Sequence, residues 1–145
     1  MNARRNLILS TLGVLLLAPM LGAHAQTAAA ERPHKVVFQV SDADPAKWNL
    51  ALNNARNVQQ DLGSDKVAIE IVAYGPGIGM LKLDSVAGAR VTEAMTSGMS
   101  VVACENTMRN QKLNKEDMNA KIGYVPSGVV EIMQRQQQGY AYLRP

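Results

Sequence analysis

The sequence predicts an α/β protein with a mainly parallel sheet of about five strands and helices on both of its faces. Short runs of β-branched residues alternate along the chain with longer stretches in which apolar residues recur every three or four positions. The chain has 145 residues, of which 47% are hydrophobic and 19% charged, and this size suits a single domain. Because parallel strands need crossover connections and these are right-handed, helices are expected to cover both faces of the sheet.

The first 25 residues are typical of a secretory signal peptide and are not expected to belong to the fold. Arg4 and Arg5 give a positively charged start, residues 7–21 form an apolar segment, and Ala23 and Ala25 match a small-x-small cleavage site. The alternative is an uncleaved anchor, but the apolar segment is shorter than the roughly 20 residues that a spanning helix needs. We therefore expect a periplasmic protein, cleaved after Ala25 and exported by the general or the twin-arginine route.

Cleavage changes the charge of the chain. The full sequence carries 15 basic and 12 acidic residues, and loss of Arg4 and Arg5 leaves a net charge of +1. The sequence has no basic stripe interleaved with aromatic residues, so neither a nucleic-acid partner nor, after cleavage, a membrane is expected. One cysteine excludes a disulfide within the chain and a multi-cysteine metal site. We expect no metal and no cofactor.

The first strand and helix are predicted after a flexible leader at residues 26–34, at the start of a single domain that extends to the last residue. Residues 35–40 are apolar and β-branched, as in a buried strand. Asp44 and Pro45 then form a helix start, with an N-cap residue before a proline at the first helical position. Apolar periodicity continues to Leu62, and a glycine follows.

The remaining elements repeat this alternation. Strands are predicted at residues 66–74, 100–104, 122–125 and 140–143. Helices are predicted at residues 83–98, after a cap at Asn106 or Thr107, after a cap at Asn114, and from Ser127 to Gln138. The glycine-rich segment at residues 75–79 is predicted to be a loop.

Cys104 is the strongest candidate for a chemically active residue. It ends the third predicted strand, at the edge where ligands approach an open parallel sheet, and it directly precedes a helix. The unpaired N–H groups and positive end of that helix favour a thiolate. Nearby, Glu105 and Asp42 would oppose this effect and Arg109 would support it. The alternative is that the cysteine is a small buried hydrophobe.

The glycine-rich loop does not match a nucleotide-binding fingerprint. Pro76 removes an amide donor, and Met80 stands where the dinucleotide fingerprint requires glycine. No phosphate-loop lysine follows. We expect the loop to fold tightly over the edge of the sheet and to form a wall beside Cys104.

Residues 103–109, 74–78, 125–131 and 138–145 together resemble the DsrE/DsrF-like family, and more closely its exported branch of small single-domain proteins. The resemblance extends over residues 35–145. It implies a flavodoxin-like fold and assembly into homo-oligomers. It also implies a role in sulfur relay, because cytoplasmic members carry sulfur as a cysteine persulfide. The chain departs from those members by its export signal and by its lack of a second cysteine.

The resemblance suggests that Cys104 accepts and passes sulfane sulfur, an activity that is at most a sulfur transfer. The expected partners are further copies of the chain and a donor or acceptor, which is either a protein or a small sulfur compound. The alternative is a non-catalytic oligomeric binding or assembly module in which Cys104 is structural. The residues expected around the thiol are the backbone donors Asn106, Thr107 and Met108 and the pocket residues Tyr74, Gly75, Pro76 and Gly77.

Overall fold

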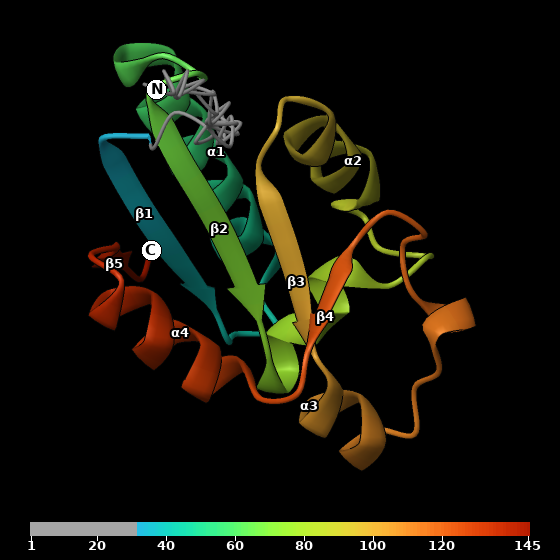
Figure 1. Cartoon of the computed structure of the whole chain (residues 1–145). Coiled ribbons are helices and arrows are strands. Elements are labelled where there is room, and N and C mark those ends of the chain that lie inside the picture. Colours follow the sequence, from blue (N-terminus) through green and yellow to red (C-terminus); the bar gives the residue numbers. More distant parts are fainter. Residues whose placement is uncertain (1–31) are drawn as a thin grey trace, which may run out of the picture.

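The computed structural model describes residues 32–145 (Figure 1). The predicted signal peptide and most of the predicted leader lie outside the described residues. All strand pairs are parallel and the strand order is β4-β3-β2-β1-β5. The strands are β1 His34–Val40, β2 Val67–Ala73, β3 Ser100–Cys104, β4 Gly123–Val125 and β5 Ala141–Leu143. The predicted α/β class with a five-stranded parallel sheet is confirmed.

Helices cover both faces of this sheet, as predicted. Helices α1 and α2 pack on one face, and α4 packs alone on the other (Figure 1). The helices are α1 Pro45–Leu62, α2 Gly88–Thr96, α3 Glu105–Asn110 and α4 Gly128–Gln137, with 3₁₀ helices η1 Gly75–Leu81 and η2 Lys115–Asp117. Within residues 32–145, no helix is long and apolar enough to cross a membrane.

The start of α1 follows directly from its sequence. The Asp44 side chain accepts a hydrogen bond of 2.8 Å from the backbone N–H of Ala46, and Pro45 occupies the first helical position. The helix then buries Trp48 and Leu52 against the sheet. An amphipathic stripe preceded by a cap therefore fixes both the start and the rotation of α1.

The apolar core differs between the two faces. On the α1 and α2 side a large cluster surrounds Phe38 and Ile71, both fully buried. The α4 side has a smaller cluster around Val37, Val72 and Ile132. On this side the carboxyl end of β3 lies close to the N-terminus of α4, since the Gly128 backbone N–H hydrogen-bonds to Cys104.

Three local predictions were wrong. The second helix begins at Gly88 and not near Leu83, which is 70% exposed, because the Leu83 N–H donates to the Asp117 carbonyl in an adjacent segment. The glycine-rich segment forms the 3₁₀ helix η1 and is not an irregular loop. Asn106 and Thr107 lie inside α3, and Cys104 is its N-cap residue.

Gly77→Ala is expected to lower the free energy of unfolding by about 3 kcal/mol, the upper end of the usual cost of overpacking. An added Cβ would lie 2.3 Å from the Val40 carbonyl oxygen and 2.8 Å from the Ser41 backbone nitrogen, so backbone would have to move. Gly88→Ala is the matched control, because a Cβ there meets nothing within 4 Å. Urea unfolding of both variants checks this prediction, and equal midpoints would contradict it.

Candidate functional site

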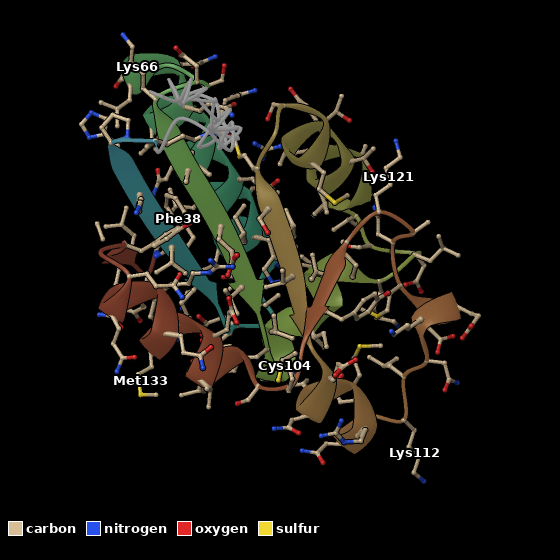
Figure 2. The ribbon with its side chains drawn as sticks, in the orientation of Figure 1. Phe38, Lys66, Cys104, Lys112, Lys121 and Met133 are labelled. Atoms are coloured by element: carbon tan, nitrogen blue, oxygen red, sulfur yellow. The ribbon has the colours of Figure 1, made fainter. Side chains whose placement is uncertain are left out.

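Cys104 lies where β3 ends and two helices begin. It is the last residue of β3 and the N-cap of α3, with extended backbone angles (φ −76°, ψ 113°). In the sheet it is paired with Val125 of β4. Its side chain lies on the α4 face, two residues along the strand from Val102, and it is only 5% exposed. Figure 2 shows the thiol beside the N-terminus of α4.

The surroundings of the thiol favour its charged form. Burial is the largest single influence and raises the pKa of Cys104. Hydrogen bonds from the Thr107 hydroxyl and from the backbone N–H groups of Gly128, Thr107 and Asn106 act in the opposite direction and outweigh burial, so the pKa lies below its ordinary value. Since Gly128 is the first residue of α4, the sulfur accepts hydrogen bonds from the first turns of two helices.

The segment after β2 holds Thr107 in place. The backbone N–H of Gly75 donates to Thr107 Oγ1 at 2.9 Å, so the hydroxyl hydrogen is available to the sulfur. The Gly75 carbonyl in turn accepts a hydrogen bond of 3.1 Å from Gln111 Nε2. Three chain segments, after β2, after β3 and after β4, therefore cooperate in stabilising one thiolate.

The family to which the chain belongs can be read from its sequence. The family model described as DsrE/DsrF-like matches residues 34–145. The chain belongs to the DsrE/DsrF-like family. The resemblance seen in the cysteine, glycine-loop and C-terminal segments is thus confirmed at the level of the family.

Solved structures show the same fold as this DsrE/DsrF-like protein. A protein of unknown function from Methanobacterium thermoautotrophicum is 37% identical, with a TM-score of 0.74 over 77% of this chain and 99% of that one. A conserved protein of unknown function from Bacteroides thetaiotaomicron (18% identity, TM-score 0.63) and the ychN protein of E. coli (12%, 0.63) show the likeness of fold alone. They cover 77% of this chain, and 94% and 99% of their own lengths. Among curated proteins, none matches the chain.

The structure brings together some of the predicted site residues. Asn106 and Thr107 place backbone N–H groups at the sulfur, although the Asn106 N–H also donates to the Pro126 carbonyl at 3.2 Å. Gly75 acts through Thr107. Tyr74 lies against the N-terminus of α4, where a Cβ added to Gly128 would be 3.1 Å from the tyrosine Cβ and Cδ1.

Other predicted site residues lie elsewhere. Met108 was expected to offer its backbone N–H to the thiolate, and its side chain is buried in the core on the α1 and α2 side of the sheet. Pro76 is exposed. Gly77 packs against the end of β1, so its role is close packing of η1 on the strand.

Sequence reasoning missed Gly128 as a donor to the thiolate. The available signal was that Ser127, a predicted N-cap, follows a strand whose carboxyl end meets the same sheet edge as Cys104.

The charged residues expected to act on the thiol have partners of their own. Arg109 donates to the Asn106 side chain, and Asp42 is 3.2 Å from Lys47 Nζ. Within residues 32–145, no group of three or more His, Cys, Asp or Glu side chains is placed to hold a metal.

Thr107→Val is expected to slow alkylation of Cys104 by iodoacetamide about tenfold at pH 7, because removing one hydrogen bond to a charged group raises the thiol pKa. The midpoint of the rate against pH should move upward. The matched control is Thr96→Val, whose hydroxyl donates to a carbonyl within α2. Intact-mass measurement of the alkylated fraction follows the reaction, and an unchanged midpoint in Thr107→Val would refute the role of this hydroxyl.

Proposed function

We propose that this DsrE/DsrF-like protein carries sulfur as a persulfide on Cys104. The observation that carries the proposal is the lowered pKa of a thiol that accepts hydrogen bonds from the Thr107 hydroxyl and from the first turns of α3 and α4. Membership of a family associated with sulfur relay supports the same role. A larger thiolate fraction at neutral pH is what a sulfur acceptor needs.

The proposed step is a sulfur exchange that needs no external oxidant. The Cys104 thiolate attacks the outer sulfur of a donor R–S–SH, and a new S–S bond forms. The S–S bond of the donor breaks, and R–S⁻ leaves with the bonding electron pair. The products are Cys104–S–SH and a thiolate, so sulfur atoms, protons and electrons balance.

The persulfide must be discharged to a partner. Cys104 is the only cysteine of the sequence, so the chain has no second thiol to resolve the persulfide. The terminal sulfur therefore passes to a thiol of an acceptor protein or to a small sulfur compound. Because Cys104 is only 5% exposed, the donor end that reaches its thiol is small.

A second candidate function is a non-catalytic oligomeric module with a structural cysteine. The low exposure of Cys104 favours it, and so does the outer side of α4, where Val129, Val130 and Met133 are 60%, 44% and 51% exposed. A second copy packed on α4 would cover these side chains and shield the thiol from solvent. In this case Cys104 reacts with neither sulfur donors nor alkylating reagents until the protein unfolds.

Intact-mass spectrometry of the native protein after treatment with polysulfide separates the two candidates. A carrier gains the mass of one sulfur atom and loses it again with dithiothreitol. It also passes the sulfur to an added small thiol. A structural cysteine leaves the native mass unchanged, and that result would dismiss the carrier.

We further propose that the protein is periplasmic, on the strength of the predicted signal. When the full-length gene is expressed in a Gram-negative host, the soluble product should be released by osmotic shock and begin at Gln26. Ala25→Leu is expected to block this cleavage, because the site requires a small residue. N-terminal mass analysis of both products checks the prediction, and wild-type protein that keeps Met1 would contradict it.

A further inference from the structure

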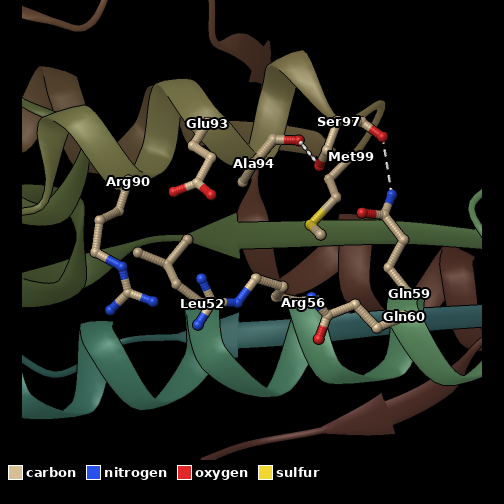
Figure 3. A pocket seen from close by; sticks show the side chains of 9 residues that line it. All are labelled: Leu52, Arg56, Gln59, Gln60, Arg90, Glu93, Ala94, Ser97 and Met99. Atoms are coloured by element: carbon tan, nitrogen blue, oxygen red, sulfur yellow. Dashed lines mark hydrogen bonds between the residues drawn. The ribbon is translucent and has the colours of Figure 1, made fainter.

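We propose that the cavity between α1 and α2 binds a small molecule that combines an apolar body with one carboxylate. The cavity has a volume of about 220 Å³ (Figure 3). It lies on the α1 and α2 side of the sheet, next to Met99 at the amino end of β3, whereas Cys104 ends the same strand. The two sites are therefore separate, and this inference does not depend on the sulfur chemistry.

The floor of the cavity is apolar. Leu52 of α1, Ala94 of α2 and Met99 line it and are 3%, 8% and 6% exposed. Such a floor, already shielded from water by the two helices, accepts the apolar part of a ligand. The volume is below the roughly 300–1,000 Å³ of pockets for drug-sized ligands, so the expected ligand is smaller than these.

The rim of the cavity carries a net positive charge. Arg90 donates to Asn49 Oδ1 at 2.5 Å and to Asn53 Oδ1 at 2.6 Å, so neutral amides hold its guanidinium in place without cancelling its charge. The Arg56 side chain makes no hydrogen bond or ion pair with any residue of the described chain. Glu93 is the single carboxylate of the lining, which leaves one positive charge in excess.

The arrangement of these groups selects a monocarboxylate. Figure 3 shows Arg56 from α1 and Glu93 from α2 pointing into the space between the helices. One carboxylate bound to the free Arg56 guanidinium balances the charge of the lining, and a planar guanidinium suits such a group. A ligand with several negative charges is disfavoured by Glu93, and an amine is repelled by the two arginines.

The experiment uses three probes of similar apolar size: hexanoate, 1-hexanol and hexylamine. Binding to the protein is followed by the NMR signal of the Met99 methyl group, which lies in the cavity lining. Hexanoate is expected to shift this signal with a saturable millimolar affinity and to bind more tightly than either other probe. Arg56→Gln is expected to weaken hexanoate binding by about tenfold, because it removes a charge-assisted hydrogen bond.

Lys121→Gln is the control, since it removes one exposed positive charge outside the cavity lining. Unchanged hexanoate affinity in this variant, together with the loss in Arg56→Gln, supports the site. Equal binding of 1-hexanol or hexylamine, no saturable shift with hexanoate, or equal losses in both variants overturns it. Because Arg56 is exposed, its replacement leaves the core intact and the result can be interpreted.

Discussion

Arg135→Met is expected to lower the free energy of unfolding at neutral pH by about 3–5 kcal/mol, the usual cost of removing one partner from a buried ion pair. Arg135 of α4 contacts Glu70 of β2 through two hydrogen bonds, of 3.1 Å from Nε and 2.7 Å from an Nη nitrogen. Glu70 is 3% exposed in the middle of the sheet. Without the guanidinium, a carboxylate is left buried with no opposite charge beside it.

The loss of unfolding free energy in Arg135→Met should depend on pH. Burial, the largest influence, raises the pKa of Glu70 above its ordinary value; Arg135 opposes this rise, and nearby Glu131 adds to it. An acid with a raised pKa binds more protons when folded, so its contribution to stability is present below the unfolded pKa and is lost as pH rises through the folded pKa. Removing Arg135 raises the folded pKa further. The variant should therefore be closest to wild type near pH 5 and furthest from it near pH 8.

Denaturant unfolding at these two pH values measures the effect. The double variant Glu70→Leu with Arg135→Met should recover most of the loss, because neither residue leaves an unpaired charge in the sheet. Arg109→Met removes an exposed arginine of α3 and is the control for the loss of one positive charge. A loss in Arg135→Met that is the same at both pH values would show that the buried carboxylate is not its cause.

The alternation of strands and helices could be predicted from the sequence because the spacing of apolar residues within each element indicates which of its faces is buried. The β-branched run of β1 and the Asp44 and Pro45 start of α1 are local signals, and both elements are found where they were expected. The start of α2 was misplaced because the apolar spacing of Leu83 fits a helix. Leu83 lies instead in a turn, where its backbone N–H donates to the Asp117 carbonyl. No local sequence pattern reveals this contact.

The candidate site likewise has residues that the local sequence indicates and residues that only the fold brings together. Cys104, Asn106 and Thr107 are neighbours in the chain, so a cysteine before a helix start already indicated a favoured thiolate. Gly128 joins them only because β4 lies next to β3 in the sheet, and the order of strands is a long-range property. Glu70 and its partner Arg135, 65 positions apart in the sequence, were missed for the same reason.

Cys104→Ser is expected to abolish persulfide loading completely while leaving the fold in place. Serine is close in size to cysteine, and its hydroxyl can accept the hydrogen bonds from Thr107 and Gly128 that the sulfur accepts in the wild type. It is not a nucleophile toward sulfane sulfur at neutral pH, because a hydroxyl lacks the accessible charged form of a thiol. The sulfur-transfer activity should therefore be lost while the thermal unfolding midpoint changes little.

The comparison with Thr107→Val makes this loss interpretable. That variant keeps the thiol and raises its pKa, so it should still load sulfur but require a higher pH to do so. Mass spectrometry after polysulfide treatment across a range of pH measures this difference. Wild type should load sulfur already at low pH, Thr107→Val only at a higher pH, and Cys104→Ser at no pH. Loading that persists in Cys104→Ser would mean that sulfur is held elsewhere on the chain, since no other thiol is present. If wild type and Thr107→Val load sulfur from the same pH, the sulfur chemistry does not depend on the hydrogen bonds at the two helix starts that surround the cysteine.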